Sequence, residues 1–574
     1  MPLPPGISYI LKRAPSLLLP GVITYFASKY VVNYCRLTLP RWILCALVLL
    51  AKPLQFVVQV QYARYMARSE ARRLGVRIVP HVQEGATSIV NKLLDMFENG
   101  YPCDILTEWA GQYGNTFETR LFTDSFIWTT EPDHVKAIMA TEFENFPKEQ
   151  LFLDQTASLL GTGVFSVNGD LWKFHRAMTR PFFTKDRISD FDIFDVHAEK
   201  ALSIARSRLD EGHPIDFQEL AARFTLDSAS SFLFSKDIES LQAGLGYPPN
   251  SGKTNSDTYE THPSNMFARA FLEAITNGTR RTFYGSEWPL MEFWGDTVRP
   301  HRLVVDQYSD HVINQYRRQE VRKAGMEADT LLAHLMEAGI DDNMIKDELF
   351  NMLVAGRDTT ACTLSYGMYM LTQHPEVASR LREEIMANVG PRLRPTYENI
   401  KEMKYLRAFI NEVLRLYPPV PINWRSARNS IVLSSKATGE QFYVPAGTTV
   451  RYSVFMMHRR KDLWGEDADI FDPARFLDER MKKYLIPNPY IFMPFNAGPR
   501  ICLGQQFAYN EISFFLVRMF QQFSDFTFAH DAQIPEYTPP KTWEHCEGRK
   551  GIETVVPGAN LTLHIKGGLW IRMR

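Results

Sequence analysis

The stretch Phe495-Asn496-Ala497-Gly498-Pro499-Arg500-Ile501-Cys502-Leu503-Gly504 places one cysteine in a loop bounded by glycines, and a helix-like run from Phe507 to Phe520 follows it. Gly498 and Gly504 permit backbone conformations closed to other residues and leave room for a flat ligand. Free backbone N–H groups and the start of the next helix both favour negative charge, so the pattern predicts a lowered thiol pKa and a metal-binding thiolate. For a lone cysteine the alternative is a buried structural residue beside an ordinary turn.

The complete spacing F-x-x-G-x-R-x-C-x-G resembles the haem-binding signature of the cytochrome P-450 monooxygenases, and every fixed position matches. The resemblance implies haem b as cofactor, with the Cys502 thiolate as the axial ligand that pushes electron density onto the iron. It also implies that Arg500 reaches a haem propionate, that Phe495 covers the sulfur and that Gly504 leaves space for the ring. The implied fold is mainly α with small β-sheets, a triangular prism of helices in which one long central helix lies over the haem.

Length and composition restrict the function classes. The chain has 574 residues, 45% hydrophobic residues and a formal net charge of −1, so it shows no general basic footprint for nucleic acid. Its six cysteines are scattered without close pairing, which argues against a disulfide framework or a zinc site. No phosphate-binding glycine motif of a nucleotide domain occurs. The electrons would therefore come from a partner, and the resemblance implies NADPH-cytochrome P-450 reductase with FAD and FMN, with cytochrome b5 as a further candidate.

The first 75 residues differ in character from residues 76–574, which we expect to form the haem-thiolate monooxygenase domain. Segments 17–32 and 42–60 are apolar, and the second approaches the roughly 20 residues that span a bilayer. Four arginines follow it at 64, 68, 72 and 73, so the positive-inside rule predicts a cytosolic catalytic domain, on the endoplasmic reticulum membrane. Either two spans, or one span with an interfacial segment, fit the pattern. A pair of core helices is the alternative to an anchor.

Residues 116–121 and 125–130 alternate as two β-strands do. Trp172 and Arg176 share one helix face at i,i+4, where an indole N–H and a guanidinium can hold one anionic group. Alone, the pair fits a surface cation–aromatic contact equally well. It resembles the W-x-x-x-R element of the family, which implies that it holds a haem propionate. By its position, the loop around 152–165 roofs a substrate pocket to which Phe165 contributes.

Residues 235–264 are polar and predict an exposed excursion between two apolar-periodic helices, 217–234 and 266–283. In the family this region is the mobile lid over the substrate entrance. Phe267, Phe271 and Leu272 would then serve substrate or membrane, although plain core packing explains them as well.

Residues 342–374 predict one long helix that begins after an N-cap at Asp342. Its centre, Ala355-Gly356-Arg357-Asp358-Thr359-Thr360, is a poor helix interior, and an acid beside an alcohol can relay protons. A kinked core helix is the alternative. The stretch matches the family's [A/G]-G-x-[D/E]-T-T, which implies that Asp358 supplies protons and Thr359 handles oxygen. Val354 and Ala355 would face the substrate.

Glu412 and Arg415 lie at i,i+3 on one helix face, and Arg475 can close a buried ionic network with them. They match the family's E-x-x-R and P-x-R-F elements, whose role is structural. The proline-rich segment after this helix would run past the haem, with Arg425 on a propionate and Val420, Ile422 and Asn423 facing substrate. His458 fits a histidine that packs a turn better than a metal ligand.

At the C-terminus, residues 561–565 and 569–573 flank Lys566-Gly567-Gly568, a pattern that predicts a hairpin whose tip, with Gly568, completes the pocket. Taken together, the motifs resemble the fungal membrane-bound alkane and fatty-acid hydroxylases. They imply hydroxylation of a small apolar substrate partitioned from a lipid bilayer. Two alternatives stay open: a reductase-independent enzyme of the same fold that rearranges hydroperoxides, and a non-catalytic haem- or lipid-binding membrane protein. Neither needs the Asp358-Thr359 pair.

Overall fold

The computed structural model describes residues 3–36, 38, 40–121, 124–189, 191–234, 236–318 and 330–574. Within these ranges the chain is mainly helical with small sheets, as predicted. The helices are α1 (Pro5–Tyr34), α2 (Arg41–Leu74), α3 (Ala86–Glu98), α4 (Asp104–Tyr113), α5 (Pro132–Lys136), α6 (Gln150–Leu160), α7 (Gly169–Thr179), α8 (Lys185–Ile188), α9 (Asp192–Asp210), α10 (Phe217–Phe234), α11 (Asp257–Glu260), α12 (Pro263–Arg280), α13 (Trp288–Met291), α14 (Arg299–Arg317), α16 (Leu331–Glu337), α17 (Asp342–Gln373), α18 (Pro375–Asn388), α19 (Tyr397–Glu402), α20 (Lys404–Leu416), α21 (Val454–Met457), α22 (Lys461–Trp464) and α23 (Gln505–Gln522). The strands are β1 (Arg77–Ile78), β2 (Thr116–Arg120), β3 (Ser125–Thr129), β4 (Ile215–Asp216), β5 (Ile422–Ser426), β6 (Ile431–Ser434), β7 (Gln441–Val444), β8 (Thr449–Ser453), β9 (Phe526–Phe528), β10 (Pro557–Ala559), β11 (Leu563–Ile565) and β12 (Trp570–Met573).

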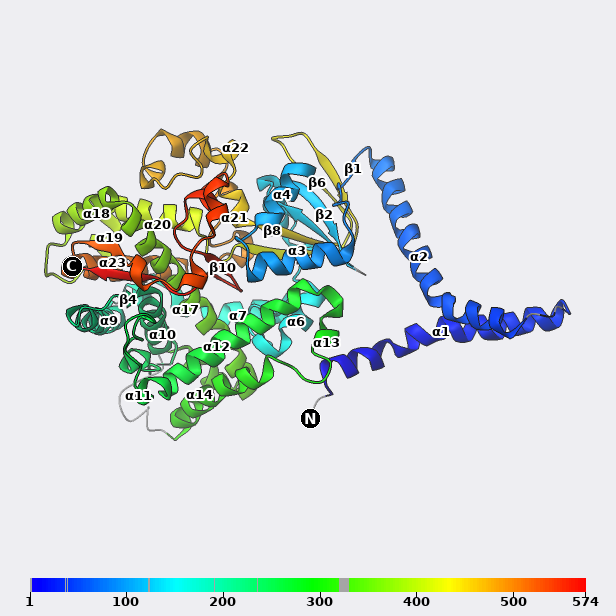
Figure 1. Cartoon of the computed structure of the whole chain (residues 1–574), viewed down its shortest axis with the longest axis horizontal. Coiled ribbons are helices and arrows are strands. Elements are labelled where there is room, and N and C mark those ends of the chain that lie inside the picture. The colour runs from blue at the N-terminus through cyan, green and yellow to red at the C-terminus, as the bar shows by residue number, and fades with distance from the viewer. Residues whose placement is uncertain are drawn as a thin grey trace.

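The two N-terminal helices form an arm that stands away from the body (Figure 1). They contain the predicted apolar segments 17–32 and 42–60 and pack on one another, with Gly21 against Val48. Their large apolar side chains are mostly exposed. Among the described residues, α2 is the helix that is long and apolar enough to cross a membrane, judged by length and composition. The arm therefore presents apolar surface that a lipid phase would cover.

The segment after the arm belongs to the body of the protein. The sequence predicts a polar linker over residues 76–104 with an amphipathic stretch near 90–97, yet α3 buries Ile89, Val90 and Leu93 in the main core. The linker prediction is wrong because one face of α3 is apolar enough to pack beside α4 and β2. The body begins within the first residues after α2.

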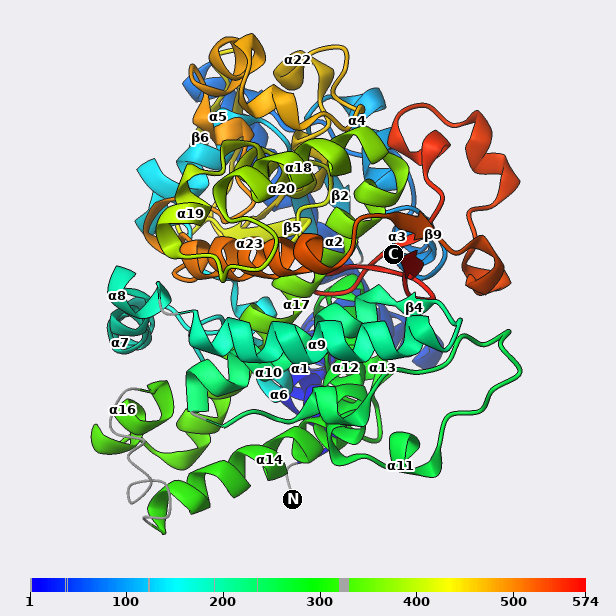
Figure 2. The same ribbon diagram turned by 90° about the vertical axis from the view of Figure 1, so that its left-hand side faces the viewer.

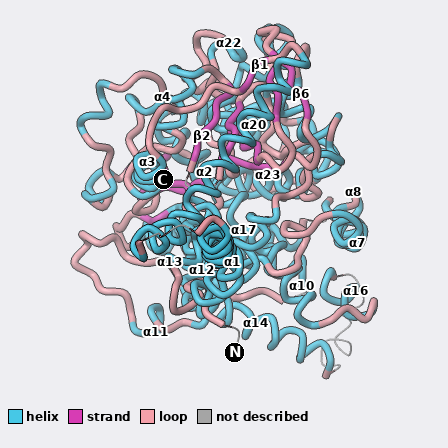
Figure 3. The backbone as a smooth tube through the Cα atoms, turned by 90° about the vertical axis from the view of Figure 1, so that its right-hand side faces the viewer, coloured by secondary structure: helices cyan, strands magenta, loops and turns pink. Residues whose placement is uncertain are grey.

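Most strands gather at one end of the body, and helices make up the rest (Figure 3). The largest sheet has the order β2-β3-β8-β5. Its β2–β3 hairpin confirms the two predicted strands, and β3 pairs with β8 in parallel. Strand β5 pairs with β8 in antiparallel orientation, and Arg425 of β5 lies opposite Val450 of β8. This pairing fixes the segment that follows the proline run after α20.

The predicted C-terminal hairpin is wrong. Strand β11 pairs with β10, whereas β12 joins β9 and β4 in a different sheet. Gly567 and Gly568 both have positive φ, so the chain turns sharply there, but the turn passes from one sheet to another. A side chain at 568 would collide with the Asp216 carboxylate. The tip of the β10–β11 hairpin is residues 560–562.

The long helix α17 crosses the body between α10 and α23 (Figure 2). Its 32 residues correspond to roughly 48 Å, and it stays continuous through the predicted weak centre. The N-cap is Asp341 and not Asp342, since the Asp341 carboxylate accepts the N–H groups of Asn343 and Met344. A Cβ at Gly356 would lie 3.1 Å from Ala229 of α10, so this glycine permits close packing of two helices.

Helices α10 and α12 confirm the two predicted helices around the polar excursion. Phe267 and Phe271 are buried in a core cluster with α17, while Leu272 is exposed. None of the three lines the cavity described below. Core packing therefore accounts for both phenylalanines.

Candidate active site

Residues far apart in the sequence surround one cavity of about 300 Å³ between α17, α7, β5 and the loop before α23. Every residue predicted to bind the cofactor lines this cavity: Trp172, Arg176, Arg425, Phe495, Arg500, Cys502 and Gly504. Thr359 and six of the seven predicted pocket residues line it as well: Phe165, Val354, Ala355, Val420, Ile422 and Asn423. Gly568 does not line it, because the glycine turn packs on Asp216. Leu561 and Thr562, at the tip of the β10–β11 hairpin, do.

The cysteine loop has the predicted form. The Cys502 N–H donates to the Phe495 carbonyl at 3.0 Å, and α23 begins directly after Gly504. Gly498 has φ of +65°, and a Cβ there would collide with the Met139 carbonyl, so glycine is required. The Cys502 side chain lines the cavity, inside the body of the protein.

The predicted lowering of the thiol pKa is wrong for the free thiol. Burial raises the pKa of Cys502, and the hydrogen bond from the Gly504 N–H and the charge of Arg176 oppose that effect without reversing it. The donors are present as expected, but removal of water from the loop outweighs them. A bound metal cation would supply the missing stabilisation of the thiolate.

Four cationic side chains gather at one side of the cavity: Arg176, Arg425, Arg500 and Lys148. The Arg500 guanidinium lies 4.5 Å from the centre of the Trp172 ring and donates to the carbonyl of Val167 at 2.9 Å. Among the described residues, no Asp or Glu lines the cavity. The cluster therefore holds positive charge without an acidic partner.

The pKa values of the cationic side chains reflect the lack of an acidic partner. Burial, together with the charges of Arg425 and Arg176, lowers the pKa of Arg500 to about 9. Burial and the neighbouring Arg425 and Arg500 hold the pKa of Lys148 well below its usual range. The buried Nε of Arg425 has no hydrogen-bond partner. A dianion would satisfy these groups.

Haem fits the donor set. Its two propionates supply the anionic charge that the cluster lacks, the cavity is otherwise largely apolar, and Cys502 presents the thiol that would ligate the iron. Lys148 belongs to this cradle, although the sequence offered no motif for it. Asn168 connects Lys148 to Arg500. Its side-chain oxygen accepts hydrogen bonds from the backbone N–H of Lys148 and from the Arg500 guanidinium.

Loop 161–166, which carries Phe165 to the cavity, is held against α17 by polar contacts. Asp347 accepts from the Thr162 N–H at 2.8 Å, Glu348 from the Val164 N–H at 2.9 Å and Asn351 from the Phe165 N–H at 3.1 Å. Side chains at 161 and 163 would collide with residues of α17, so both glycines are required. This anchoring fixes one wall of the pocket, and the polar residues within an otherwise buried helix were its only sequence signal.

The acid–alcohol pair on α17 is divided between two faces. Thr359 lines the cavity, and its hydroxyl donates to the Ala355 carbonyl at 2.7 Å. Asp358 does not line the cavity; its carboxylate accepts from Arg357 at 2.6 Å. Burial raises the pKa of Asp358, and Arg357 opposes that shift. An acid with a raised pKa can bind and release a proton near neutral pH more readily than an ordinary aspartate.

A second carboxyl group lies behind the threonines. Glu511 on α23 is fully buried, and burial raises its pKa well above the ordinary value, with the hydroxyls of Thr360 and Ser228 beside it. The sequence analysis missed Glu511. A lone acid on an apolar helix nine positions after Cys502 was the available signal.

The predicted ionic network is formed. Arg415 donates two hydrogen bonds of 2.7 Å to Glu412, and the Nε of Arg475 lies 3.5 Å from the same carboxylate. All three side chains are buried. His458 packs below them, accepts from the Met493 N–H at 3.0 Å and contacts the Arg415 carbonyl at 3.1 Å. Burial lowers the pKa of His458 to about 3, which fits a neutral structural histidine.

The cavity combines three features under the long helix α17: a cysteine thiol, a cationic cradle and an apolar wall. This combination is typical of haem-thiolate enzymes. Residues 84–541 match the family model described as Cytochrome P450. Cytochrome P450 52A6 of Candida tropicalis is 32% identical over 514 residues, which cover 86% of this chain and 94% of the relative. Cytochrome P450 52A5 of Candida maltosa is 35% identical over 75% of this chain and 80% of the relative, and Cytochrome P450 monooxygenase pvhE of Talaromyces variabilis 33% identical over 71% and 76%.

The chain belongs to the cytochrome P450 family. It is therefore a haem-thiolate monooxygenase of hydrophobic substrates that takes its electrons from a redox partner. The apolar cavity and the arm agree with a membrane-associated enzyme. The two alternatives left open by the sequence are not favoured.

Proposed function

We propose that the protein is anchored in the endoplasmic reticulum membrane and hydroxylates a long apolar substrate, a fatty acid or an n-alkane. The observation that carries this proposal is the cavity itself, which joins the Cys502 thiol, a cationic cradle and an apolar wall. A narrow apolar site suits an unactivated hydrocarbon chain, since burial of each CH₂ group contributes about 0.8 kcal/mol. The exposed apolar arm brings the enzyme to the phase in which such substrates dissolve.

Haem b is the proposed cofactor. Cys502 would bind its iron, and Trp172, Arg176, Arg425 and Arg500 would hold its propionates. Lys148 adds a further cation to the same cradle. When bound, a haem with thiolate ligation supplies the activation of dioxygen. Phe495 and Gly504 line the same cavity as Cys502, and Gly504 leaves space beside the sulfur.

The proton path is assigned to α17. Asp358, which does not line the cavity and has 13% of its side chain exposed, takes up a proton from water. Thr359 holds a proton at Oγ1 on the cavity face, so the two residues act on either side of one helical wall. The apolar residues Phe165, Val354 and Ile422 exclude bulk water from the substrate.

The electron donor is proposed to be NADPH-cytochrome P-450 reductase, which carries FAD and FMN, with cytochrome b5 as a second donor. Residues 1–75 form the anchor, and residues 76–574 face the cytosol. The four arginines that follow the apolar part of α2 support this orientation through the positive-inside rule. The start of α1 packs on Phe293 beside α13, and α2 returns to the same body. Both ends of the arm therefore lie on the side of the catalytic domain.

One experiment tests the proposal. The purified protein is reduced under carbon monoxide to record the thiolate-shifted haem band. It is then given reductase, NADPH and either a fatty acid or an n-alkane of equal chain length. We expect the band and an NADPH-dependent alcohol product, and we expect the Asp358→Asn variant to keep the band with turnover lower by on the order of 10²-fold. A protein with the band but without product from either substrate would refute the substrate class, and absence of the band would refute Cys502 as ligand.

A further inference from the structure

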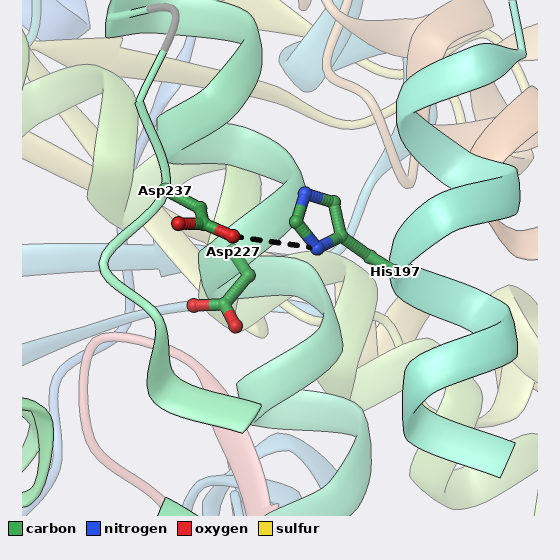
Figure 4. Close-up of side chains that lie close together, drawn as sticks. All are labelled: His197, Asp227 and Asp237. Carbon is green, nitrogen blue, oxygen red and sulfur yellow. Dashed lines mark ion pairs between the residues drawn. The ribbon is translucent and has the colours of Figure 1, made fainter. Parts of the chain in front are cut away.

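A second polar cluster lies outside the haem cavity, among α9, α10 and the segment that follows α10. His197 projects from α9, Asp227 from α10 and Asp237 from the segment before residue 240 (Figure 4). One ligand atom of each residue lies within 4.8 Å of the others. None of the three residues lines the active-site cavity.

The hydrogen bonds of His197 determine which ring nitrogen faces the cluster. Its Nε2 lies 3.0 Å from the Ser231 hydroxyl, a partner that can fix the ring tautomer. Its Nδ1 lies 3.9 Å from an Asp237 oxygen and has no hydrogen-bond partner, in a side chain that is 95% buried. A ring with its proton on Nε2 thus directs a free lone pair at a carboxylate, which is unfavourable unless a cation lies between them.

The two carboxylates lack other cationic partners. Asp227 is buried and accepts the N–H groups of Ser240 at 2.7 Å and Leu241 at 2.9 Å. These bonds orient the carboxylate and leave lone pairs free for a metal. In the described part of the chain, no Lys or Arg forms an ion pair with Asp227 or Asp237.

The surroundings position the third ligand without closing the site. The Tyr308 hydroxyl donates to the backbone carbonyl of Asp237 at 3.1 Å and so holds the segment in place. The Asp237 side chain is 24% exposed, which provides a path for an ion and space for a water ligand. In a tetrahedral zinc site with bonds of about 2.0–2.2 Å, the ligand atoms would lie about 3.5 Å apart. The ligand atoms now lie within 4.8 Å of one another, so binding would require the cluster to contract by about 1 Å.

We propose that His197, Asp227 and Asp237 bind one divalent transition-metal ion, for which Zn²⁺ is the best fit. An imidazole nitrogen with two carboxylates suits zinc, whereas Mg²⁺ and Ca²⁺ prefer oxygen ligands throughout. The ion joins α9 and α10 to the beginning of the polar excursion before α12. Its role is structural, because the cluster lies outside the cavity and would join the segment after α10 to two helices.

The test uses the full-length, haem-loaded protein after treatment with a chelator and gel filtration. Zinc is titrated by calorimetry, and bound zinc per haem is measured by mass spectrometry of the metal. The variants are Asp237→Asn and His197→Gln, and the matched control is Asp257→Asn, which removes an exposed aspartate of α11. The carbon monoxide band of each variant reports whether the body is folded.

We expect the wild type and the Asp257→Asn control to bind about one zinc ion per haem with equal affinity. Both cluster variants should bind zinc at least tenfold more weakly. If His197→Gln fails to fold, Asp237→Asn decides the matter, because its side chain is partly exposed. Equal zinc uptake by the wild type and Asp237→Asn, or no uptake by the wild type, would overturn the proposal. Calcium binding of equal strength in the wild type and His197→Gln would likewise exclude the histidine as a ligand.

Discussion

Replacement of Arg415 by lysine should destabilise the body of the protein, although the charge is kept. Arg415 makes five hydrogen bonds: two to Glu412 and one each to the carbonyls of His458, Ala468 and Ile470, at 2.8, 2.6 and 3.2 Å. A lysine has three donors on one nitrogen and cannot reproduce the planar fork. It would leave about two of the buried carbonyls without a partner.

The magnitude follows from those contacts. Each buried acceptor without a partner costs about 1–3 kcal/mol, so two unpaired carbonyls cost about 2–6 kcal/mol. We therefore expect the variant to lose about 2–6 kcal/mol of stability. If the loss affects mainly the native state, thermal inactivation speeds up by on the order of 10²-fold or more.

The assay is the half-life of the carbon monoxide-reactive haem-thiolate form at a fixed elevated temperature. Arg480→Lys is the matched control, because Arg480 also binds several acidic side chains but is 24% exposed. Solvent-screened pairs of this kind contribute about 0–1 kcal/mol. A half-life of Arg415→Lys within twofold of the wild type, or equal damage in the control, would contradict the reasoning.

Three further predictions concern the cofactor cradle, the Asp216 carboxyl group and the pocket loop. The Lys148→Gln variant should release haem to an acceptor protein roughly tenfold faster than the wild type, because a charge-assisted contact of about 1.5–3 kcal/mol is lost. Lys173 is an exposed lysine of α7, so the Lys173→Gln variant should release haem at the wild-type rate. Burial and a neighbouring glutamate raise the pKa of Asp216 to about 7, so the folded state holds the extra proton and stability falls as pH rises from about 4 through 7. The rate of thermal inactivation should rise with pH over this range in the wild type but not in Asp216→Asn, whose Oδ1 still accepts from both backbone N–H groups. An equal pH dependence in the two proteins would contradict the raised pKa of Asp216. Gly163→Ala should push the pocket loop off α17 and weaken substrate-induced spectral shifts at least fivefold, whereas Gly111→Ala, with open space around it, should leave them unchanged.

The local motifs of this chain were predictable because their chemistry depends on close spacing. The cysteine loop around Cys502, the Trp172–Arg176 face and the Glu412–Arg415 pair each act through a turn or one helix face. Helix α17 was predictable for the same reason, because one uninterrupted run of residues specifies both its length and its centre. Local geometry alone places these side chains relative to one another.

The contacts between distant segments were decided by the tertiary structure. Lys148 becomes part of the cofactor cradle only when residue 168 brings it beside Arg500. The partner of β11 is β10 and not β12, because a glycine turn does not determine which sheet receives each strand. Asp358 and Thr359 are neighbours in the sequence, but successive helical residues point about 100° apart, so only the threonine faces the cavity.

The sequence by itself indicated the candidate reactive centre, because the cysteine loop, the Trp172–Arg176 pair and the acid–alcohol pair need particular residues at particular spacings. The tertiary structure decided the charge balance around the haem, the wall held by α17 and the second polar cluster at His197. Those features depend on residues separated by tens to hundreds of positions. Their proximity results from packing of the whole core, which no local pattern specifies.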